Sequence, residues 1–251
     1  MLDIDGTLAP IVEHASDALV PEPTRQLLIA IARVYGLVGC ISGRRASEAR
    51  AMVSIGTISY VGSHGVELLR AGWTEAVLDA GLAEWVAPIR EFARAVDTAQ
   101  LRRARVRIED KGPIVAFHWR GAPNEDAARV EVDAVAARAQ EEGLHVHWGR
   151  KVLEVRPPVQ IDKGAGVTRL LTEVGPEITA ALYVGDDTTD LDAFDVLERM
   201  HREGRLAHVV RVGVRSDESP SGIEQRADLV VDGPEGVRQL LAMLGGEPVA
   251  A

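Results

Sequence analysis

Apolar runs of strand length alternate with helical segments near both ends of the chain, and this alternation limits the possible folds most. The runs are short and continuous, as in buried strands, and the helical segments carry apolar residues three or four positions apart. In the first part of the chain these segments are residues 1–4, 24–35, 36–41, 45–53 and 58–61. After Pro157 and Pro158 they are residues 164–174, 180–184, 191–203, 208–212, 229–231 and 236–244. Strands that alternate with helices pair in parallel, so we expect an α/β fold with a Rossmann-like parallel sheet.

The middle of the chain has a different pattern, with hairpins in place of the alternation. Two long helical stretches, residues 78–96 and 126–142, accompany two pairs of strand-like runs. Short turns that contain glycine join the members of each pair, as in hairpins. The pairs are residues 105–108 with 114–119 and residues 144–147 with 151–155. We therefore expect a discontinuous core from residues 1–69 and 157–251, interrupted by an inserted α+β domain at residues 70–156.

Composition excludes several classes of protein. Of the 251 residues, 46% are hydrophobic and 26% charged, a balance typical of globular rather than disordered chains. The single cysteine, Cys40, excludes a disulfide framework and a cysteine-rich zinc site. The net charge of −10 argues against a nucleic-acid partner, and no apolar run is long enough to span a membrane. Since Asp3 puts a charge where a signal peptide would begin, we expect a cytoplasmic protein, and we expect a monomer.

Two carboxylates lie at the end of the first predicted strand, in the motif Asp3-Ile4-Asp5-Gly6-Thr7-Leu8. Asp3 and Asp5 are two residues apart, so both can face one site. Such a pair suits a divalent cation, proton transfer or a carboxylate nucleophile, and the turn at Gly6-Thr7 would place backbone N–H groups near an anion. We favour this interpretation over a solvated junction between strand and turn.

Two further segments suit an anion. Ser42-Gly43-Arg44 follows the second predicted buried strand and opens a helix, a combination that also occurs in ordinary loops and helix caps. Lys163 lies at the start of a predicted helix, where a cation is unfavourable to the helix dipole. The chain has only three lysines among 28 basic residues, so this position favours a functional role over an ordinary loop lysine.

An acidic motif follows the strand predicted at residues 180–184. In Gly185-Asp186-Asp187-Thr188-Thr189-Asp190, three carboxylates lie within five residues. Open α/β sheets bind ligands at the carboxyl ends of their strands, and a metal ion is the natural partner of like charges packed so closely. Helix capping would use one of these acids, not three. We therefore expect a metal site here.

These four motifs, in this order, resemble those of haloacid dehalogenase-like phosphatases. The resemblance implies that family's fold, a Rossmann-like sheet whose inserted α+β domain is a cap that determines substrate specificity. It implies that Asp3 is a nucleophile that forms an aspartyl-phosphate and that Asp5 is the general acid and base. Ser42 and Lys163 would neutralise the phosphoryl oxygens. Mg²⁺ would be held by Asp3, Asp186 and the backbone carbonyl of Asp5.

Within that superfamily the chain resembles the trehalose-6-phosphate phosphatases more closely. The stretches that carry this resemblance are residues 62–68, 108–111, 118–120, 149–157 and 185–194. The resemblance implies substrate-binding roles for Gly43, Arg44, His64, Glu109, Lys111, Arg120, Arg150 and Glu154. The last five of these, with His64 from the core side, would read the glucose units through their charged groups. Without the resemblance, a cross-strand ion-pair ladder on a solvated hairpin is the commoner explanation for Glu109, Lys111 and Arg120.

Three interpretations of the function stay open. The first is an Mg²⁺-dependent phosphatase that acts on a small-molecule sugar phosphate, trehalose 6-phosphate, with Asp187 and Asp190 orienting the metal and its waters. The second is a phosphatase for sucrose phosphate or mannosyl phosphoglycerate, or a phosphomutase. The third is a sugar-phosphate-binding module that has lost catalysis, although the complete acidic motifs argue against it. Since only Met1 and Leu2 precede Asp3, we also expect the central strand to be short.

Overall fold

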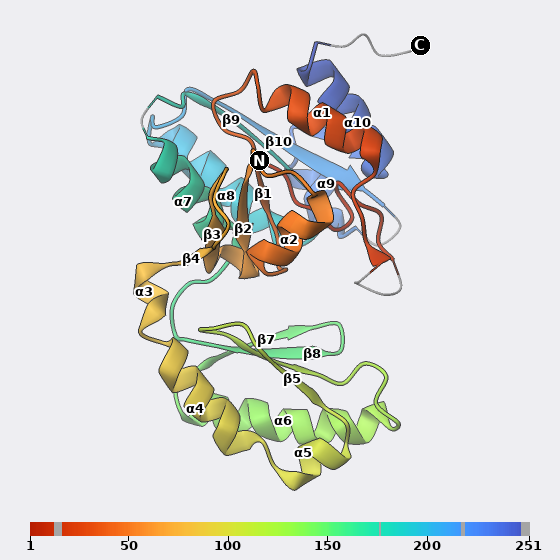
Figure 1. The fold of residues 1–251 in the computed structure, drawn as a ribbon, viewed down its shortest axis with the longest axis vertical. Coiled ribbons are helices and arrows are strands. Elements are labelled where there is room, and N and C mark those ends of the chain that lie inside the picture. Colours follow the sequence, from red (N-terminus) through yellow and green to blue (C-terminus); the bar gives the residue numbers. More distant parts are fainter. Residues whose placement is uncertain (13–16, 176, 217–218, 247–251) are drawn as a thin grey trace. The chain divides into compact units, whose positions relative to one another are not determined.

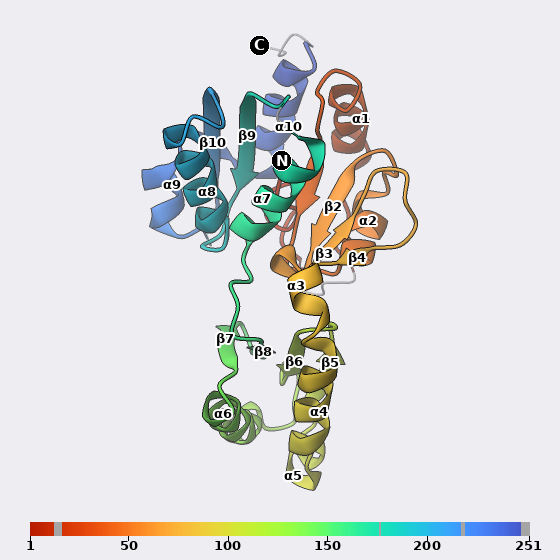
Figure 2. The ribbon, with the colours of Figure 1, turned by 90° about the vertical axis from the view of Figure 1, so that its left-hand side faces the viewer.

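The computed structural model describes residues 1–12, 17–175, 177–216 and 219–246 of the chain. The chain divides into two compact units, shown from two sides in Figure 1 and Figure 2. The core unit is Met1–Val77 with Asp162–Ala251, and the insert unit is Leu78–Ile161. The insert was expected at residues 70–156, and the insert unit of the structure begins and ends later, at Leu78 and Ile161. Within the described ranges, no helix is long and apolar enough to cross a membrane.

The sheet of the core unit is mainly parallel, which confirms the fold class expected from the alternation. Its parallel pairs are β1 (Gly39–Ile41) with β2 (Ser59–Gly62), and β10 (His208–Arg215) with both β9 (Ala180–Gly185) and β11 (Leu229–Asp232). Leu2 joins the two halves through parallel bridges to Cys40 of β1 and Val184 of β9. The first segment therefore lies at the centre of the sheet. It pairs there through single bridges only, in agreement with the short central strand expected from the sequence. Beyond β2 lie β3 (Glu67–Leu69), antiparallel to it, and β4 (Val77–Leu78).

Helices cover both faces of this sheet because successive strand residues point in opposite directions. Cys40, Tyr60 and Val184 pack into one apolar cluster with α1 (Glu22–Ile31), α2 (Ala46–Val53) and α10 (Gly233–Leu244). Their chain neighbours Ile41, Val61 and Tyr183 pack into a second cluster with α7 (Lys163–Val174), α8 (Asp190–Arg202) and α9 (Ser221–Arg226). The two clusters hold the strands rigidly, so the loops at the strand ends start from fixed points.

The insert unit is an antiparallel sheet with helices on one face (Figure 1). Its strand order is β5 (Arg107–Asp110), β6 (Val115–His118), β8 (Val152–Arg156) and β7 (His145–Gly149), so both expected hairpins are confirmed. Phe117, Leu153 and Val155 pack against α4 (Val86–Val96), α5 (Ala99–Arg103) and α6 (Glu125–Glu141). The alternate residues of these strands face away from the helices.

The single helix expected at residues 78–96 is divided in the structure. α3 (Ala80–Ala83) ends before Trp85, and α4 begins at Val86. Pro88 lies in the first turn of α4, where its missing N–H has no intrahelical partner to lose. In a continuous helix its ring would clash with the carbonyl of Glu84, so the proline accounts for the break.

Candidate active site

The carboxyl ends of three neighbouring core segments bring predicted site residues to one edge of the sheet. Asp3 follows the central Leu2, Ser42 follows β1, and Asp186 follows β9. All three side chains are buried. This edge of an open parallel sheet is where ligands bind, because the loops that leave the strands enclose a crevice there.

Lys163 joins this edge from the start of α7. Its Nζ lies 2.7 Å from Oδ1 of Asp3 and 2.7 Å from Oδ1 of Asp190, and all three side chains are at most 5% exposed. Burial lowers the pKa of Lys163, but the carboxylates of Asp190 and Asp3 together raise it by more. The pKa therefore lies above its usual range, and the ammonium stays charged. The N-cap Asp162, which accepts a bond from the N–H of Ala165, offsets the unfavourable effect of this cation on the helix.

Asp190 holds the lysine and the neighbouring loop in place. Its Oδ1 accepts hydrogen bonds from Lys163 and, at 2.6 Å, from the hydroxyl of Tyr183. Its Oδ2 accepts bonds from the backbone N–H groups of Asp186 at 3.1 Å and Asp187 at 3.0 Å. Four donors fill the capacity of this carboxylate. Sequence reasoning missed Tyr183, although a tyrosine inside an apolar strand run signals a buried hydroxyl that needs a partner.

Asp3, Asp186 and Asp190 form a buried cluster that could hold a metal ion, with one oxygen of each within 4.8 Å of the others. Burial raises the pKa of Asp3 well above its usual range, and burial with the charge of Asp190 raises the pKa of Asp186 to about 6. Hard carboxylate oxygens are the donors that Mg²⁺ and Ca²⁺ prefer. Because the oxygens of Asp190 already have four donors, Asp3 and Asp186 are the better candidates for ligands. A divalent cation therefore fits this cluster.

The turn after Asp5 supports Asp186 closely. The hydroxyl of Thr7 donates a 3.1 Å hydrogen bond to Oδ1 of Asp186. Gly6 has a φ of +83°, and a Cβ at this position would lie 2.1 Å from Oδ2 of Asp186. Gly6 is thus required both by the turn and by the close approach of the Asp186 carboxylate. Asp187, in contrast to Asp186, is exposed, and its Oδ1 accepts a bond from the N–H of Thr188.

Ser42-Gly43-Arg44 forms a turn before α2. Oγ of Ser42 accepts a 3.1 Å hydrogen bond from the N–H of Arg44. The guanidinium of Arg44 donates two bonds to Asp5, from Nε to Oδ2 at 2.8 Å and from Nη2 to Oδ1 at 2.6 Å. The sequence led us to expect Arg44 on the substrate, and the structure places it on the residue expected to be the general acid and base.

A left-handed turn packs against this segment. Ser63, His64 and Gly65 have φ values of 50°, 59° and 115°. The N–H of Ser63 donates to the carbonyl of Arg44 at 2.7 Å, and the N–H of His64 donates to the carbonyl of Ser42 at 3.1 Å. The ring of His64 lies so close to Gly43 that a Cβ there would be 2.7 Å from Nε2. The expected residues His64 and Gly43 are therefore in contact beside Ser42.

Glu67 is a second supporting residue that sequence reasoning missed. Its buried carboxylate accepts a 2.9 Å hydrogen bond from the N–H of Ala46 at the start of α2 and pairs with Arg45 at 3.4 Å. A negative charge is stabilised at this positive end of a helix. The glutamate in the otherwise apolar run Val66-Glu67-Leu68-Leu69 was the available signal.

In the insert unit, three expected sugar-reading residues lie on the sheet face opposite the helices. Glu109 and Glu154 lie opposite the same residue of β6, from its two sides. Glu154 accepts bonds from Lys111 at 3.0 Å and from Arg156 at 2.6 Å, and it is only 6% exposed. Glu109 pairs with His118 at 2.7 Å. Glu109, Lys111 and Glu154 thus all form ion pairs on this face, and Glu154 is more buried than it would be in a solvated ladder.

Arg120 and Arg150 lie at the other end of these strands. Nη2 of Arg120 donates a 3.3 Å hydrogen bond to the carbonyl of Arg150, and both residues are exposed. β6 and β8 pair from Val115 opposite Val155 to His118 opposite Val152, and Arg120 and Arg150 lie in turns beyond the second of these pairs. The two ends of the paired segment are three residues apart, which is about 10 Å at the usual strand rise. The five expected residues of this unit therefore form two groups rather than one.

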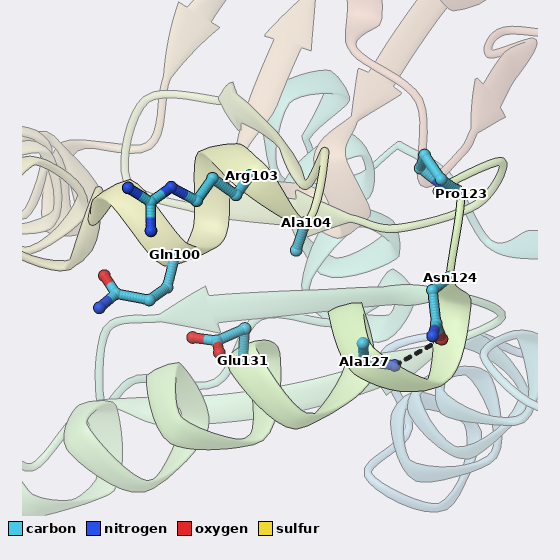
Figure 3. Close-up of a pocket in the computed structure, with 7 residues that line it drawn as sticks. All are labelled: Gln100, Arg103, Ala104, Pro123, Asn124, Ala127 and Glu131. Atoms are coloured by element: carbon cyan, nitrogen blue, oxygen red, sulfur yellow. Dashed lines mark hydrogen bonds between the residues drawn. The ribbon is translucent and has the colours of Figure 1, made fainter.

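Two cavities have linings that share no residue with the predicted site. One, of about 340 Å³, lies in the insert unit between α5 and the start of α6, where Asn124 caps the helix by accepting a bond from the N–H of Ala127 (Figure 3). The other, of about 470 Å³, lies at the carboxyl ends of α7 and α8 in the core unit. Neither of these two cavities is therefore lined by the buried charges at the strand edge.

Comparison with known proteins identifies the family of this chain. The model of the trehalose-phosphatase family matches residues 1–228. The trehalose 6-phosphate phosphatase RA3 of Zea mays is 30% identical over 79% of the chain and 59% of its own length. The trehalose-phosphate phosphatase of Mycobacterium bovis is 36% identical over 78% of the chain and 50% of its own length. The chain thus spans little more than half the length of these relatives.

The same fold occurs in solved structures. A trehalose-6-phosphate phosphatase related protein superposes with a TM-score of 0.71 at 20% identity, over 98% of this chain and 96% of the other. The C-terminal domain of a trehalose-6-phosphate phosphatase from C. albicans gives a TM-score of 0.68 at 21% identity, over 98% and 91% of the two chains. Since the family model covers residues from the first motif to the last, the chain belongs to the trehalose-phosphatase family.

Proposed function

We propose that the protein is an Mg²⁺-dependent phosphatase that hydrolyses trehalose 6-phosphate to trehalose and inorganic phosphate, a step of trehalose biosynthesis. The observation that carries the proposal is the 2.7 Å contact between Nζ of Lys163 and Asp3 at a strand end of an α/β sheet. A buried carboxylate beside a buried cation suits attack on a phosphate, because the cation offsets the repulsion between two anions. Membership of the family supports the choice of substrate.

Asp3 is the nucleophile in this proposal. One of its oxygens attacks phosphorus, and the bond between phosphorus and the sugar oxygen breaks. Asp5, which begins the cycle as the carboxylic acid, gives that oxygen its proton. In the second half of the reaction a water molecule gives a proton to Asp5 and attacks the aspartyl-phosphate. Inorganic phosphate leaves, and the carboxylate of Asp3 is restored.

Lys163 and Ser42 neutralise the charge that spreads over the phosphoryl oxygens. The ammonium of Lys163 is held by Asp190 and lies next to the oxygen that would attack. Ser42, whose Oγ accepts a bond from Arg44, can donate its own proton to a phosphoryl oxygen. Groups that are fixed before the substrate arrives need no reorganisation during the reaction.

Mg²⁺ would be held by the carboxylates of Asp3 and Asp186 and by the backbone carbonyl of Asp5. When bound, it supplies positive charge at the phosphate that one lysine beside three carboxylates does not provide. The oxygen donors and the closeness of the cluster support this choice of cation. Asp187 and Asp190 act on the site indirectly, Asp190 through Lys163 and the loop that carries Asp186.

The insert unit is the substrate-specificity domain in this proposal, with a core at residues 1–69 and 157–251 and an insert at 70–156. Glu109, Lys111 and Glu154 contact the glucose hydroxyls, because charged groups form strong hydrogen bonds with hydroxyls. Arg120 and Arg150 act as a separate group, and His64 and Gly43 contribute from the core unit. The monomeric state and the cytoplasmic location expected from the sequence also belong to the proposal. Size-exclusion chromatography with light scattering tests the first, and fractionation of the source cells tests the second.

Phosphate release from trehalose 6-phosphate, with Mg²⁺ and with EDTA, tests the activity. We expect turnover with Mg²⁺, its loss with EDTA, and a loss of at least about 1000-fold in Asp3→Asn with an unchanged far-UV spectrum. Sucrose 6-phosphate and mannosyl phosphoglycerate serve as competing substrates. Faster release from either would contradict the substrate, and tight binding without release would favour a binding module.

A further inference from the structure

Arg44 and Asp5 form a bidentate ion pair in the core unit. Nε and Nη2 of the guanidinium face the two carboxylate oxygens at 2.8 and 2.6 Å. We propose that Arg44 is a positioning residue, which fixes the carboxylate of Asp5 for proton transfer, and not a contact to the substrate phosphate. The inference rests on the proposed phosphatase activity, in which Asp5 both gives and takes a proton.

The backbone of Arg44 is fixed from both sides. Its N–H donates to Oγ of Ser42 at 3.1 Å, and its carbonyl accepts the N–H of Ser63 at 2.7 Å. Two residues later the buried carboxylate of Glu67 holds the N–H of Ala46 at 2.9 Å. The Cα of Arg44 therefore has little freedom, and the direction of its side chain is largely determined by the turn.

Asp5 lacks comparable support from its own segment. Its backbone is held by a bridge to Ala9, but its side chain is 40% exposed, whereas that of Arg44 is 22% exposed. A carboxylate that reaches water samples several rotamers unless a partner selects one. A guanidinium with two parallel bonds selects both the position and the plane of the carboxylate. The strength of this pairing also raises the pKa of Arg44 above its usual range.

Position matters for Asp5 because one carboxylate serves two reactions. It must reach the sugar oxygen in the first half of the reaction and a water molecule in the second half. Displacement of a catalytic group by about 1 Å can cost about 100-fold in rate. Binding of the ground-state phosphate, in contrast, does not need the carboxyl group of Asp5. Loss of Arg44 should therefore lower kcat much more than it raises KM.

The test compares Arg44→Met and Arg44→Lys with the wild type on two kinds of substrate, an alkyl phosphate and an aryl phosphate. Trehalose 6-phosphate has a poor leaving group that needs a proton, whereas p-nitrophenyl phosphate releases p-nitrophenolate without one. Steady-state kinetics give kcat and KM for the first substrate. For p-nitrophenyl phosphate, stopped-flow measurement of the p-nitrophenolate burst gives the rate at which Asp3 is phosphorylated. Arg50→Met in α2 is the matched control, since Arg50 bonds the carbonyl of Trp73 away from the site.

For Arg44→Met we expect kcat on trehalose 6-phosphate to fall by about 10- to 100-fold, with KM changed less than about threefold. The p-nitrophenolate burst should keep its rate within about threefold. Arg44→Lys should lie between, because lysine keeps the charge but not the paired geometry. Arg50→Met should behave as the wild type.

Two results would overturn the inference. A rise of KM by about tenfold with an unchanged kcat would make Arg44 a substrate contact. A fall in the burst rate as large as the fall in kcat would show that the turn at Ser42 had lost its structure.

If the wild type hydrolyses p-nitrophenyl phosphate and glucose 6-phosphate but not trehalose 6-phosphate, the proposed substrate is wrong. The same comparison with glucose 6-phosphate as the alkyl ester then decides the role of Arg44.

Discussion

The hydroxyl of Tyr183 donates a 2.6 Å hydrogen bond to Oδ1 of Asp190, the oxygen that also accepts the ammonium of Lys163. Both side chains are almost completely buried, and Tyr183 additionally packs edge-to-face on Phe194. A phenol on one side and an ammonium on the other divide the charge of this carboxylate between them. The tyrosine therefore influences how strongly Asp190 holds Lys163, and through Lys163 it acts on Asp3.

Tyr183→Phe removes this one hydrogen bond and keeps the aromatic ring in place. Without the phenol, Asp190 should hold Lys163 more strongly, so that less of the ammonium's charge is available to a phosphoryl group on Asp3. We expect kcat for phosphate release to fall by about tenfold, and stability to fall by about 1–2 kcal/mol because a buried acceptor loses a donor. Steady-state kinetics and urea unfolding measure the two effects. Unchanged kcat with lower stability would restrict Tyr183 to a structural role.

Gly6→Ala should damage the proposed metal site. A Cβ at this position would lie 2.1 Å from Oδ2 of Asp186, and the φ of +83° is strained for alanine. Gly72→Ala is the matched control, because Gly72 has a φ of +78° but no atom within 4 Å of the added Cβ. Both variants should lose about 1 kcal/mol from the backbone strain. Only Gly6→Ala should lose more than about tenfold in Mg²⁺-dependent activity, and equal losses would argue against the close approach to Asp186.

The sequence predicted the core fold well because its strands are short apolar runs with clear ends. Cys40 and Ile41 lie on opposite faces of β1, and a short run that is apolar at both positions is typical of a strand buried on both sides. The break in the helix at residues 78–96 was missed, since the periodicity continues through Trp85 and only Pro88 marks a new start.

The site was predicted less completely, because motifs identify the residues but not their partners. Three acids in the motif at residues 185–190 look alike in sequence, yet only Asp190 is surrounded by four donors. Arg44 reaches across 39 positions to Asp5, a pairing that spacing along the chain does not reveal. Partners distant in sequence depend on how the turns are built, and that information lies in the fold.

Metal-free protein should lose stability as the pH rises. Burial and Asp190 raise the pKa of Asp186 to about 6, so the fold favours the protonated carboxyl. The resulting stability is complete below about pH 4, the unfolded value, and is lost as the pH passes 6. The loss should reach about 3 kcal/mol at most. Differential scanning calorimetry of the metal-free protein at pH 4 and pH 8 measures it.

Mg²⁺ should oppose this loss of stability at high pH. A cation that binds only the folded protein raises Tm, and protons compete with it for Asp3 and Asp186. We therefore expect added Mg²⁺ to raise Tm more at pH 8 than at pH 5. Asp186→Asn should abolish most of the Mg²⁺-dependent rise, and an undiminished rise in this variant would place the metal elsewhere.

Asp192→Asn should stabilise the protein at neutral and alkaline pH. Partial burial, followed by the charges of Asp162, Asp195 and Asp190, raises the pKa of Asp192 to about 6. The ionised form is thus disfavoured in the folded state, a cost that is absent below about pH 4 and complete above pH 6. Asparagine removes the charge, so the gain should be about 1 kcal/mol at pH 8, after allowance for solvent screening, or roughly 2–4 °C in Tm. The gain should vanish near pH 4, and a pH-independent gain would mean that packing rather than charge repulsion is responsible.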